Sequence, residues 1–86
     1  MTSSTKNYIK NLDKSTRRKL IEIVKLEWNL PEIEYWLLNY AFVEERMREN
    51  TCRKLHISTT KYSTLLKEVL IKVESTIQQL DKIRTL

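Results

Sequence analysis

Residues 51–73 have the sequence TCRKLHISTTKYSTLLKEVLIKV, a helical pattern with one interruption. From Tyr62 onward, apolar side chains recur every three or four residues, which is the spacing of one face of an α-helix. The preceding His56-Ile57-Ser58 breaks this period, and Ser58 is a favourable residue for capping the start of a helix. The stretch therefore predicts a short helix, a tight turn, and a long final helix over about residues 59–82.

The rest of the chain extends the same helical pattern toward the N-terminus. Apolar spacings of three and four predict a first helix over about residues 15–28, a second over 31–42 that begins at a proline, and a third over 44–54. Residues 1–12 are polar without a sustained period, so we expect a flexible basic arm there. No strand-like alternation occurs in the sequence. The predicted fold is all-α: one compact four-helix domain over residues 13–86, containing a helix-turn-helix and a long C-terminal helix.

The composition narrows the function classes. The chain has 86 residues, no glycine, one proline and one cysteine. Phosphate-binding loops of the Walker or dinucleotide type need glycine, so the sequence excludes them. One cysteine cannot close an internal disulfide, and no apolar run approaches the ~18 residues of a membrane span. We therefore expect a cytoplasmic protein with no membrane partner.

The charge is unevenly distributed along the chain. The net charge is +5, and residues 1–20 carry six basic and one acidic side chain, residues 21–50 three and seven, and residues 51–86 seven and three. Two basic ends around an acidic middle are typical of a surface that faces phosphates, and equally of an ordinary solvated surface.

Small hydroxyl and basic side chains gather around the start of the predicted last helix. If Tyr62, Leu65 and Leu66 face inward, the residues between them face outward. Hydroxyls can bond phosphates or base edges, and lysine and arginine neutralise phosphates, whereas a plain capping cluster would only keep the helix soluble. The candidate DNA-binding residues are Arg53, Lys54, Ser58, Thr59, Thr60, Lys61, Ser63, Thr64 and Lys67.

These motifs resemble those of a known group of regulators. The run LPEIEYWLLNY at residues 30–40, followed by Leu55-x-Ile57-Ser58 and Tyr62, is similar to the helix-turn-helix of sigma-factor region four. It is more similar still to small phage transcription regulators of the ArpU/RinA type, over about residues 30–78. The resemblance implies a DNA-binding transcriptional regulator of a phage or mobile element, whose recognition helix begins at Ser58 and enters the major groove of double-stranded DNA. The sequence departs from the family at His56, where glycine is common.

A second interpretation keeps this fold but assigns it a protein partner. The predicted recognition helix lacks the arginine or glutamine of the commonest base contacts, and two glutamates open the predicted third helix. In this alternative the chain modulates RNA polymerase or another transcription regulator without contacting DNA. The partner surface would consist of Tyr35, Trp36, Tyr40, Glu44 and Glu45.

The absence of glycine also makes a prediction about one backbone position. The first residue of the turn that follows Leu55 often adopts a positive φ, where glycine costs least. Either His56 adopts a positive φ, which histidine tolerates better than most residues, or the turn has a different geometry and the two helices cross at another angle.

Catalysis and metal binding find little support in the residues. Cys52 and His56 lie four apart, but they are the chain's only cysteine and only histidine, and no nucleophile has an adjacent base with an orienting third group. We expect no metal, no cofactor and no enzymatic activity.

Both ends of the chain leave alternatives open. The basic residues near the N-terminus could contact phosphates or form a solvated arm; they are Lys6, Lys10, Lys14, Arg17, Arg18 and Lys19. The apolar residues near the C-terminus could fold back on the first helix or pair with a second copy, and we favour a homodimer. They are Val73, Ile77, Leu80, and Ile83 or Leu86.

Overall fold

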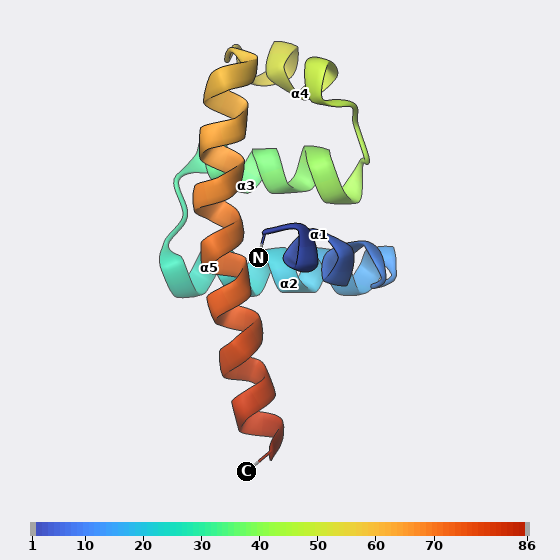
Figure 1. Cartoon of the computed structure of the whole chain (residues 1–86), viewed down its shortest axis with the longest axis vertical. Helices are drawn as coiled ribbons and strands as arrows, with labels where there is room; N and C mark the ends of the chain where they lie inside the picture. Colours follow the sequence, from blue (N-terminus) through green and yellow to red (C-terminus); the bar gives the residue numbers. More distant parts are fainter. Residues whose placement is uncertain (1, 86) are drawn as a thin grey trace.

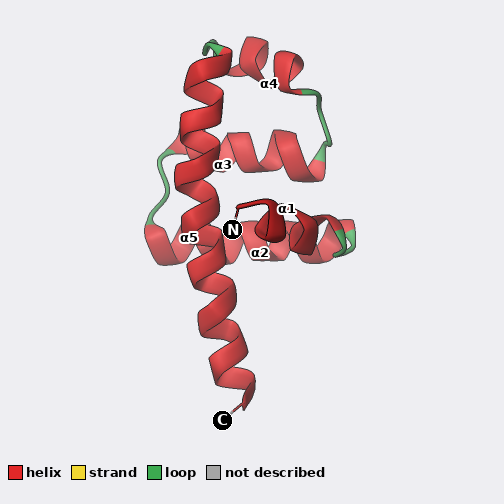
Figure 2. Ribbon diagram, in the orientation of Figure 1, coloured by secondary structure: helices red, strands yellow, loops and turns green. Residues whose placement is uncertain are grey.

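The structure, a computed structural model, describes residues 2–85, with side chains described for residues 4–80. This part of the chain is entirely helical and has no strand (Figures 1 and 2). The elements are α1 (Thr2–Lys10), α2 (Lys14–Trp28), α3 (Glu32–Leu38), the π-helix η1 (Asn39–Val43), α4 (Arg48–Leu55) and α5 (Thr59–Thr85). The predicted all-α fold with a long C-terminal helix is confirmed. The predicted number of four helices is wrong, because the described residues contain five α-helices and a π-helix.

The central element is α5, against which the other four α-helices pack (Figure 1). Its 27 residues correspond to a length of about 40 Å at 1.5 Å per residue, close to the 43 Å long axis of the molecule. The inward face of α5 contributes Val69, Leu70 and Val73, each at most 1 % exposed, and these meet Val24 of α2 and Leu37 of α3 in one apolar core. The core therefore anchors the middle of α5.

The predicted first helix is confirmed as α2, and its ends show why it forms there. Asp13 caps the start, accepting a hydrogen bond from the Thr16 backbone N–H at 2.7 Å. The helix ends at Asn29, whose φ of 49° lies in the left-handed region that asparagine tolerates. The buried Leu30 follows, and Pro31 is the N-cap residue of α3, which therefore begins one position after the predicted start at residue 31.

The predicted second helix changes its hydrogen-bond pattern partway. After α3 the chain continues as η1, in which the Glu44 N–H bonds the Asn39 carbonyl five residues back, at 2.9 Å. A π turn holds one residue more than an α turn and rotates the side chains that follow it. Phe42 and Val43 are both about 5 % exposed as a result, and they extend the core toward α2.

The expectation that residues 1–12 lack regular structure is wrong. Residues 2–10 form α1, which packs on α5, and Ile9 is only 2 % exposed. Isolated helices of this length are unstable in water, so the burial of Ile9 and Leu12 against the core is what supports α1. The apolar residues of this stretch are Met1, Tyr8, Ile9 and Leu12, and the last three span little more than one helical turn, so no sustained period shows this helix in the sequence.

The third predicted helix begins later than expected. It was expected to span residues 44–54, but α4 begins at Arg48, and Glu44 and Glu45 lie before it. Glu45 has a φ of 53°, so the chain turns sharply there, and Met47 is extended at the helix start. No helix of the described residues combines the length and the apolar character that crossing a bilayer requires.

Candidate nucleic-acid interface

The candidate site is formed by α4, the start of α5 and the turn between them. α4 ends at Leu55, and its C-cap His56 has a φ of 56° and a ψ of 47°, so of the two alternatives for this turn the left-handed one holds. The Ile57 N–H bonds the Cys52 carbonyl at 3.0 Å, which closes the end of α4. Ser58 then caps α5, its Oγ accepting a hydrogen bond from the Lys61 N–H at 3.1 Å. Both ends of the turn are therefore fixed by hydrogen bonds.

The inward side of this unit is packed as the spacing predicted. Tyr62, Leu65 and Leu66 are each 8 % exposed or less and belong to the main core, and Cys52 is buried beside the turn. Burial raises the pKa of the Tyr62 phenol above its ordinary value, because an anionic phenolate would be poorly solvated there. The first two turns of α5 are thus anchored along one side, which leaves the opposite side free.

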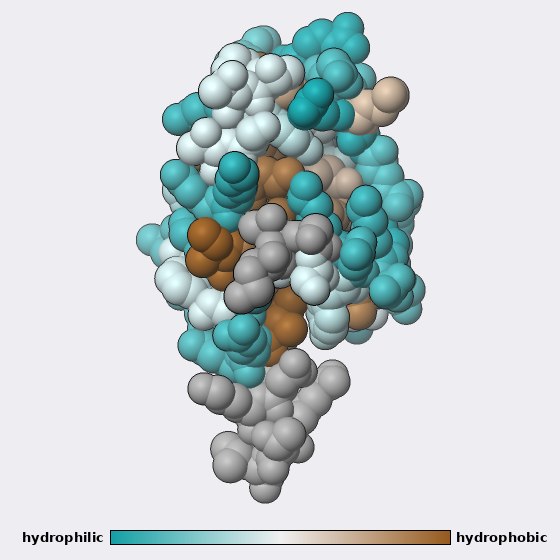
Figure 3. Space-filling model, viewed as in Figure 1, coloured by the Kyte–Doolittle hydropathy of each residue, from teal (hydrophilic) through white to brown (hydrophobic). Residues whose placement is uncertain are grey.

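The outward side presents all of the predicted DNA-binding side chains. Figure 3 shows pale and hydrophilic side chains over this end of the molecule. Two hydroxyls are engaged locally: Ser58 in its cap, and Thr64, whose Oγ1 donates to the Thr60 carbonyl at 3.1 Å. The exposed residues are Arg53, Lys54, Ser58, Thr59, Thr60, Lys61, Ser63, Thr64 and Lys67.

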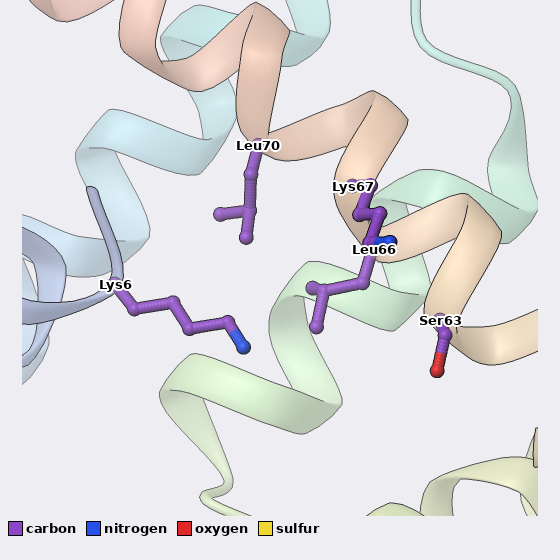
Figure 4. Close-up of a pocket in the computed structure, with 5 residues that line it drawn as sticks. All are labelled: Lys6, Ser63, Leu66, Lys67 and Leu70. Carbon is purple, nitrogen blue, oxygen red and sulfur yellow. The ribbon is translucent and has the colours of Figure 1, made fainter. Parts of the chain in front are cut away.

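Two more cations border this surface. Lys6 of α1 extends toward a cavity of about 120 Å³ that Ser63 and Lys67 of α5 also line (Figure 4). Lys6 and Ser63 also line a neighbouring cavity of about 490 Å³, together with Arg48 and Glu49 of α4. Sequence reasoning included Lys6 only as one of six N-terminal cations and missed Arg48. No local signal could have found them, since only the packing of α1 and α4 places them beside α5.

Arg17 has a different role from the other basic residues near the N-terminus. Its side chain is 13 % exposed, and its guanidinium donates to the carbonyls of Leu12, Lys10 and Phe42 at 2.9–3.0 Å. It also forms an ion pair with Glu45 at 3.1 Å. Arg17 therefore links α1, α2 and η1. Neither of the two alternatives given for the N-terminal basic residues, a phosphate contact or a solvated arm, applies to Arg17.

The residues of the alternative partner surface are only partly brought together. Trp36 stacks on Tyr40 with ring centroids 5.8 Å apart and meets Tyr35 edge-on at 5.4 Å. The Arg46 guanidinium lies 5.4 Å from the Tyr40 ring centre and pairs with Glu44 at 2.7 Å. Glu45 instead pairs with Arg17, as described above. The expected pair of glutamates opening the third helix is therefore wrong, because both precede α4 and both are paired with arginines.

The described residues give no indication of a metal centre. They contain no group of three or more histidine, cysteine, aspartate or glutamate side chains that could hold an ion. Cys52 is buried and its Sγ lies 3.8 Å from the Ser58 carbonyl, whereas His56 is exposed. Cys52 thus lies in the interior and His56 on the surface, so the two side chains do not form a shared site.

The site consists of a capped helix start that the core anchors on its inner side and that exposes hydroxyls and cations on its outer side. Comparisons of the chain with models of protein families, with curated proteins and with solved structures find no match.

Proposed function

We propose that this chain binds double-stranded DNA through the start of α5, as the recognition helix of a helix-turn-helix, and thereby regulates transcription. The observation that carries the proposal is the exposed, hydroxyl-rich and cationic surface on the first turns of α5, opposite the buried anchors Tyr62, Leu65 and Leu66. The placement among regulators of phages or mobile elements rests on the sequence resemblance alone.

The charges of this surface suit a polyanion. Arg53, Lys54, Lys61 and Lys67 are all exposed, and the sequence has no carboxylate between Glu49 and Glu68. Lys6 adds another cation from α1. Contacts of this kind release counterions from DNA, so the affinity should fall as salt rises.

The shape of the surface suits a groove. The major groove of B-DNA is about 12 Å wide and admits one α-helix. At the start of α5, Thr60, Lys61 and Thr64 are exposed side chains that could reach base edges or phosphates, and threonine methyl groups can contact thymine methyls. The Lys61 N–H of the first turn is bound by Ser58 Oγ, and the amides of Thr59 and Thr60, which have no carbonyl partner within the helix, favour an anion.

The second candidate is a protein-binding modulator that uses the face formed by α3 and η1. One observation favours it: Trp36 is 45 % exposed although it stacks on Tyr40, and aromatic residues are enriched at protein interfaces. In this alternative the partner is RNA polymerase or another transcription regulator.

Fluorescence anisotropy with a labelled DNA duplex at 50 and 200 mM salt tests the first candidate. The double variant Lys61→Ala/Lys67→Ala should bind about tenfold more weakly, and its salt slope should be smaller by about two. The matched control is Lys14→Ala/Arg18→Ala, which removes the same charge from exposed positions of α2. Equal losses in both double variants would contradict the assignment to α5.

A separate outcome would move the function to the second candidate. This is the absence of DNA binding by the wild type at 50 mM salt, together with binding to purified RNA polymerase that Trp36→Ala abolishes. Retention of DNA binding by Trp36→Ala is expected under the first candidate.

A further inference from the structure

A groove crosses the molecule between α1, α5 and the segment from η1 to the start of α4. It consists of four neighbouring cavities, which have volumes of about 120, 490, 190 and 300 Å³ in order along the groove. Lys6 and Leu66 line the first three cavities, and Lys10 and Arg46 line the last two. The groove therefore runs without interruption from the start of α5 to α2.

The floor of the groove is apolar at its centre. Figure 4 shows Leu66 and Leu70 of α5 pointing into the space that the Lys6 side chain enters from α1. An apolar cavity of about 150 Å³ can hold one benzene molecule. The adjoining cavity of about 190 Å³ therefore has room for one aromatic or branched apolar side chain. Its floor consists of Ala41, Phe42, Tyr62 and Leu66.

Cations outnumber carboxylates along the rim of the groove. In the described part of the chain, the residues that line the four cavities include six cations but only two carboxylates. Both carboxylates already have partners: Glu45 pairs with Arg17 at 3.1 Å, and Glu49 with Arg48 at 4.0 Å. The rim cations that have no carboxylate at ion-pair distance within residues 4–80 are Lys6, Lys10 and Lys67.

We propose that this groove binds an acidic peptide segment of another protein, in which one aromatic or branched apolar side chain lies between carboxylates. The carboxylates pair with the three lysines of the rim, and the apolar side chain fills the cavity over Ala41 and Phe42. Charge complementarity selects the acidic partner, and removal of apolar surface from water favours its anchor.

The apolar floor is the feature that favours a peptide over a nucleic acid. The backbone of a DNA duplex offers phosphates to Lys6 and Lys67, but it has no aromatic or branched apolar group to place over Phe42. An acidic peptide with one apolar anchor uses both the rim and the floor. This inference does not depend on DNA binding by α5.

Fluorescence anisotropy of labelled synthetic peptides, with the full chain as titrant at 50 mM salt, tests the proposal. The probe is the peptide EEDFDEE. Its two matched controls are EEDADEE, which lacks the apolar anchor, and QQNFNQQ, which lacks the charges. The wild type should bind the probe about tenfold more tightly than either control, because each control keeps only half of the match.

A pair of double variants tests whether the rim of the groove holds the carboxylates. Lys6→Ala/Lys10→Ala should weaken binding of the probe about tenfold, because two ion pairs are lost. The matched control is Lys14→Ala/Arg18→Ala, which removes the same charge from exposed positions of α2 that line none of the four cavities. The control should bind the probe within about twofold of the wild type.

A third variant tests the floor. Ala41→Met places a larger side chain in the cavity and should remove the preference for EEDFDEE over EEDADEE. Circular dichroism should show equal helix content in all three variants and the wild type.

Three results would overturn the proposal. The first is equal binding of EEDFDEE and EEDADEE by the wild type, and the second is an equal loss in the two double variants. The third is a wild type that does not bind the probe. If that wild type binds a DNA duplex more tightly than Lys6→Ala/Lys10→Ala does, the cations of the groove serve phosphates instead.

Discussion

The two ends of α5 belong to one continuous helix but present opposite surfaces. At the N-terminal end the exposed side chains are hydroxyls and cations, such as Thr60, Lys61 and Lys67. Near residue 80, further along α5, the exposed side chains include three apolar ones, Tyr8 of α1, Ile23 of α2 and Leu80 of α5, beside the polar Gln78 and Gln79. A polar surface over a packed interior is suited to a charged ligand, whereas an apolar surface is suited to another protein chain.

The difference shows how a small glycine-free chain can separate two roles. One buried face of α5, from Tyr62 to Thr76, supports both ends of the helix. Because that buried face is continuous, the outward residues at the two ends of α5 can differ without changing the fold. The two ends should therefore depend on the same core but respond independently to surface substitutions.

The largest expected effect comes from breaking the shared support. Leu70 is 1 % exposed, and Leu70→Ala should lower the free energy of unfolding by about 2–5 kcal/mol, from lost burial and a residual cavity. That is a large part of the ~5–15 kcal/mol that stabilises an ordinary domain. Urea unfolding followed by circular dichroism measures it, and DNA binding should weaken with it.

The control for this substitution is the next residue. Ile71 is 62 % exposed, so Ile71→Ala should change the free energy of unfolding by less than about 0.5 kcal/mol. If the two alanine variants were equally stable, the buried core along α5 would not be the common support of both ends.

A smaller effect distinguishes the two turns that end helices in the left-handed conformation. His56 ends α4 at the upper end, and Asn29 ends α2 lower in the molecule. The left-handed conformation costs a residue with a Cβ about 1–2 kcal/mol, of which the greater unfolded-state entropy of glycine offsets a part. His56→Gly should therefore raise the free energy of unfolding by about 0.5–1 kcal/mol.

Asn29→Gly is the comparison for that substitution, because asparagine already tolerates this conformation, and its gain should be the smaller of the two. Thermal unfolding of both variants measures the difference. A loss of stability in His56→Gly would mean that the imidazole makes a contribution beyond the turn geometry.

Sequence reasoning succeeded where periodicity and backbone sterics act locally. The spacing from Tyr62 to Val73 identified the inward face of α5, and the positive φ common after Leu55 was one of the two geometries considered for His56. It failed where distant packing decides the structure. α1 is stable because the core buries its Ile9. Arg17 is held by backbone carbonyls that come together only when the chain folds.

The smallest expected effect is a pH dependence of stability that the Asp13 cap of α2 has and the Ser58 cap of α5 lacks. Hydrogen bonds from Thr16 lower the pKa of Asp13 below its usual value of 3.8, so its carboxylate stabilises the folded state at higher pH. This contribution should be present above about pH 4 and lost as the pH falls through the lowered pKa of the folded state. Ser58, which caps α5, has no such titration.

Thermal unfolding between pH 2 and 6 should therefore show a slightly steeper acid loss in the wild type than in Asp13→Asn, which keeps a capping oxygen without the charge change. Identical pH profiles would mean that the Asp13 cap makes no measurable contribution in solution.

The most direct test of the account is one NMR measurement, the ¹H–¹⁵N spectrum of the labelled full chain titrated with a DNA duplex at 50 mM salt. Binding through the upper end predicts that the largest amide shifts fall within residues 53–67 and that the amides of Ile23 and Ile77 are little changed. Shifts centred on Trp36 and Tyr40, or no shifts at all, would contradict it.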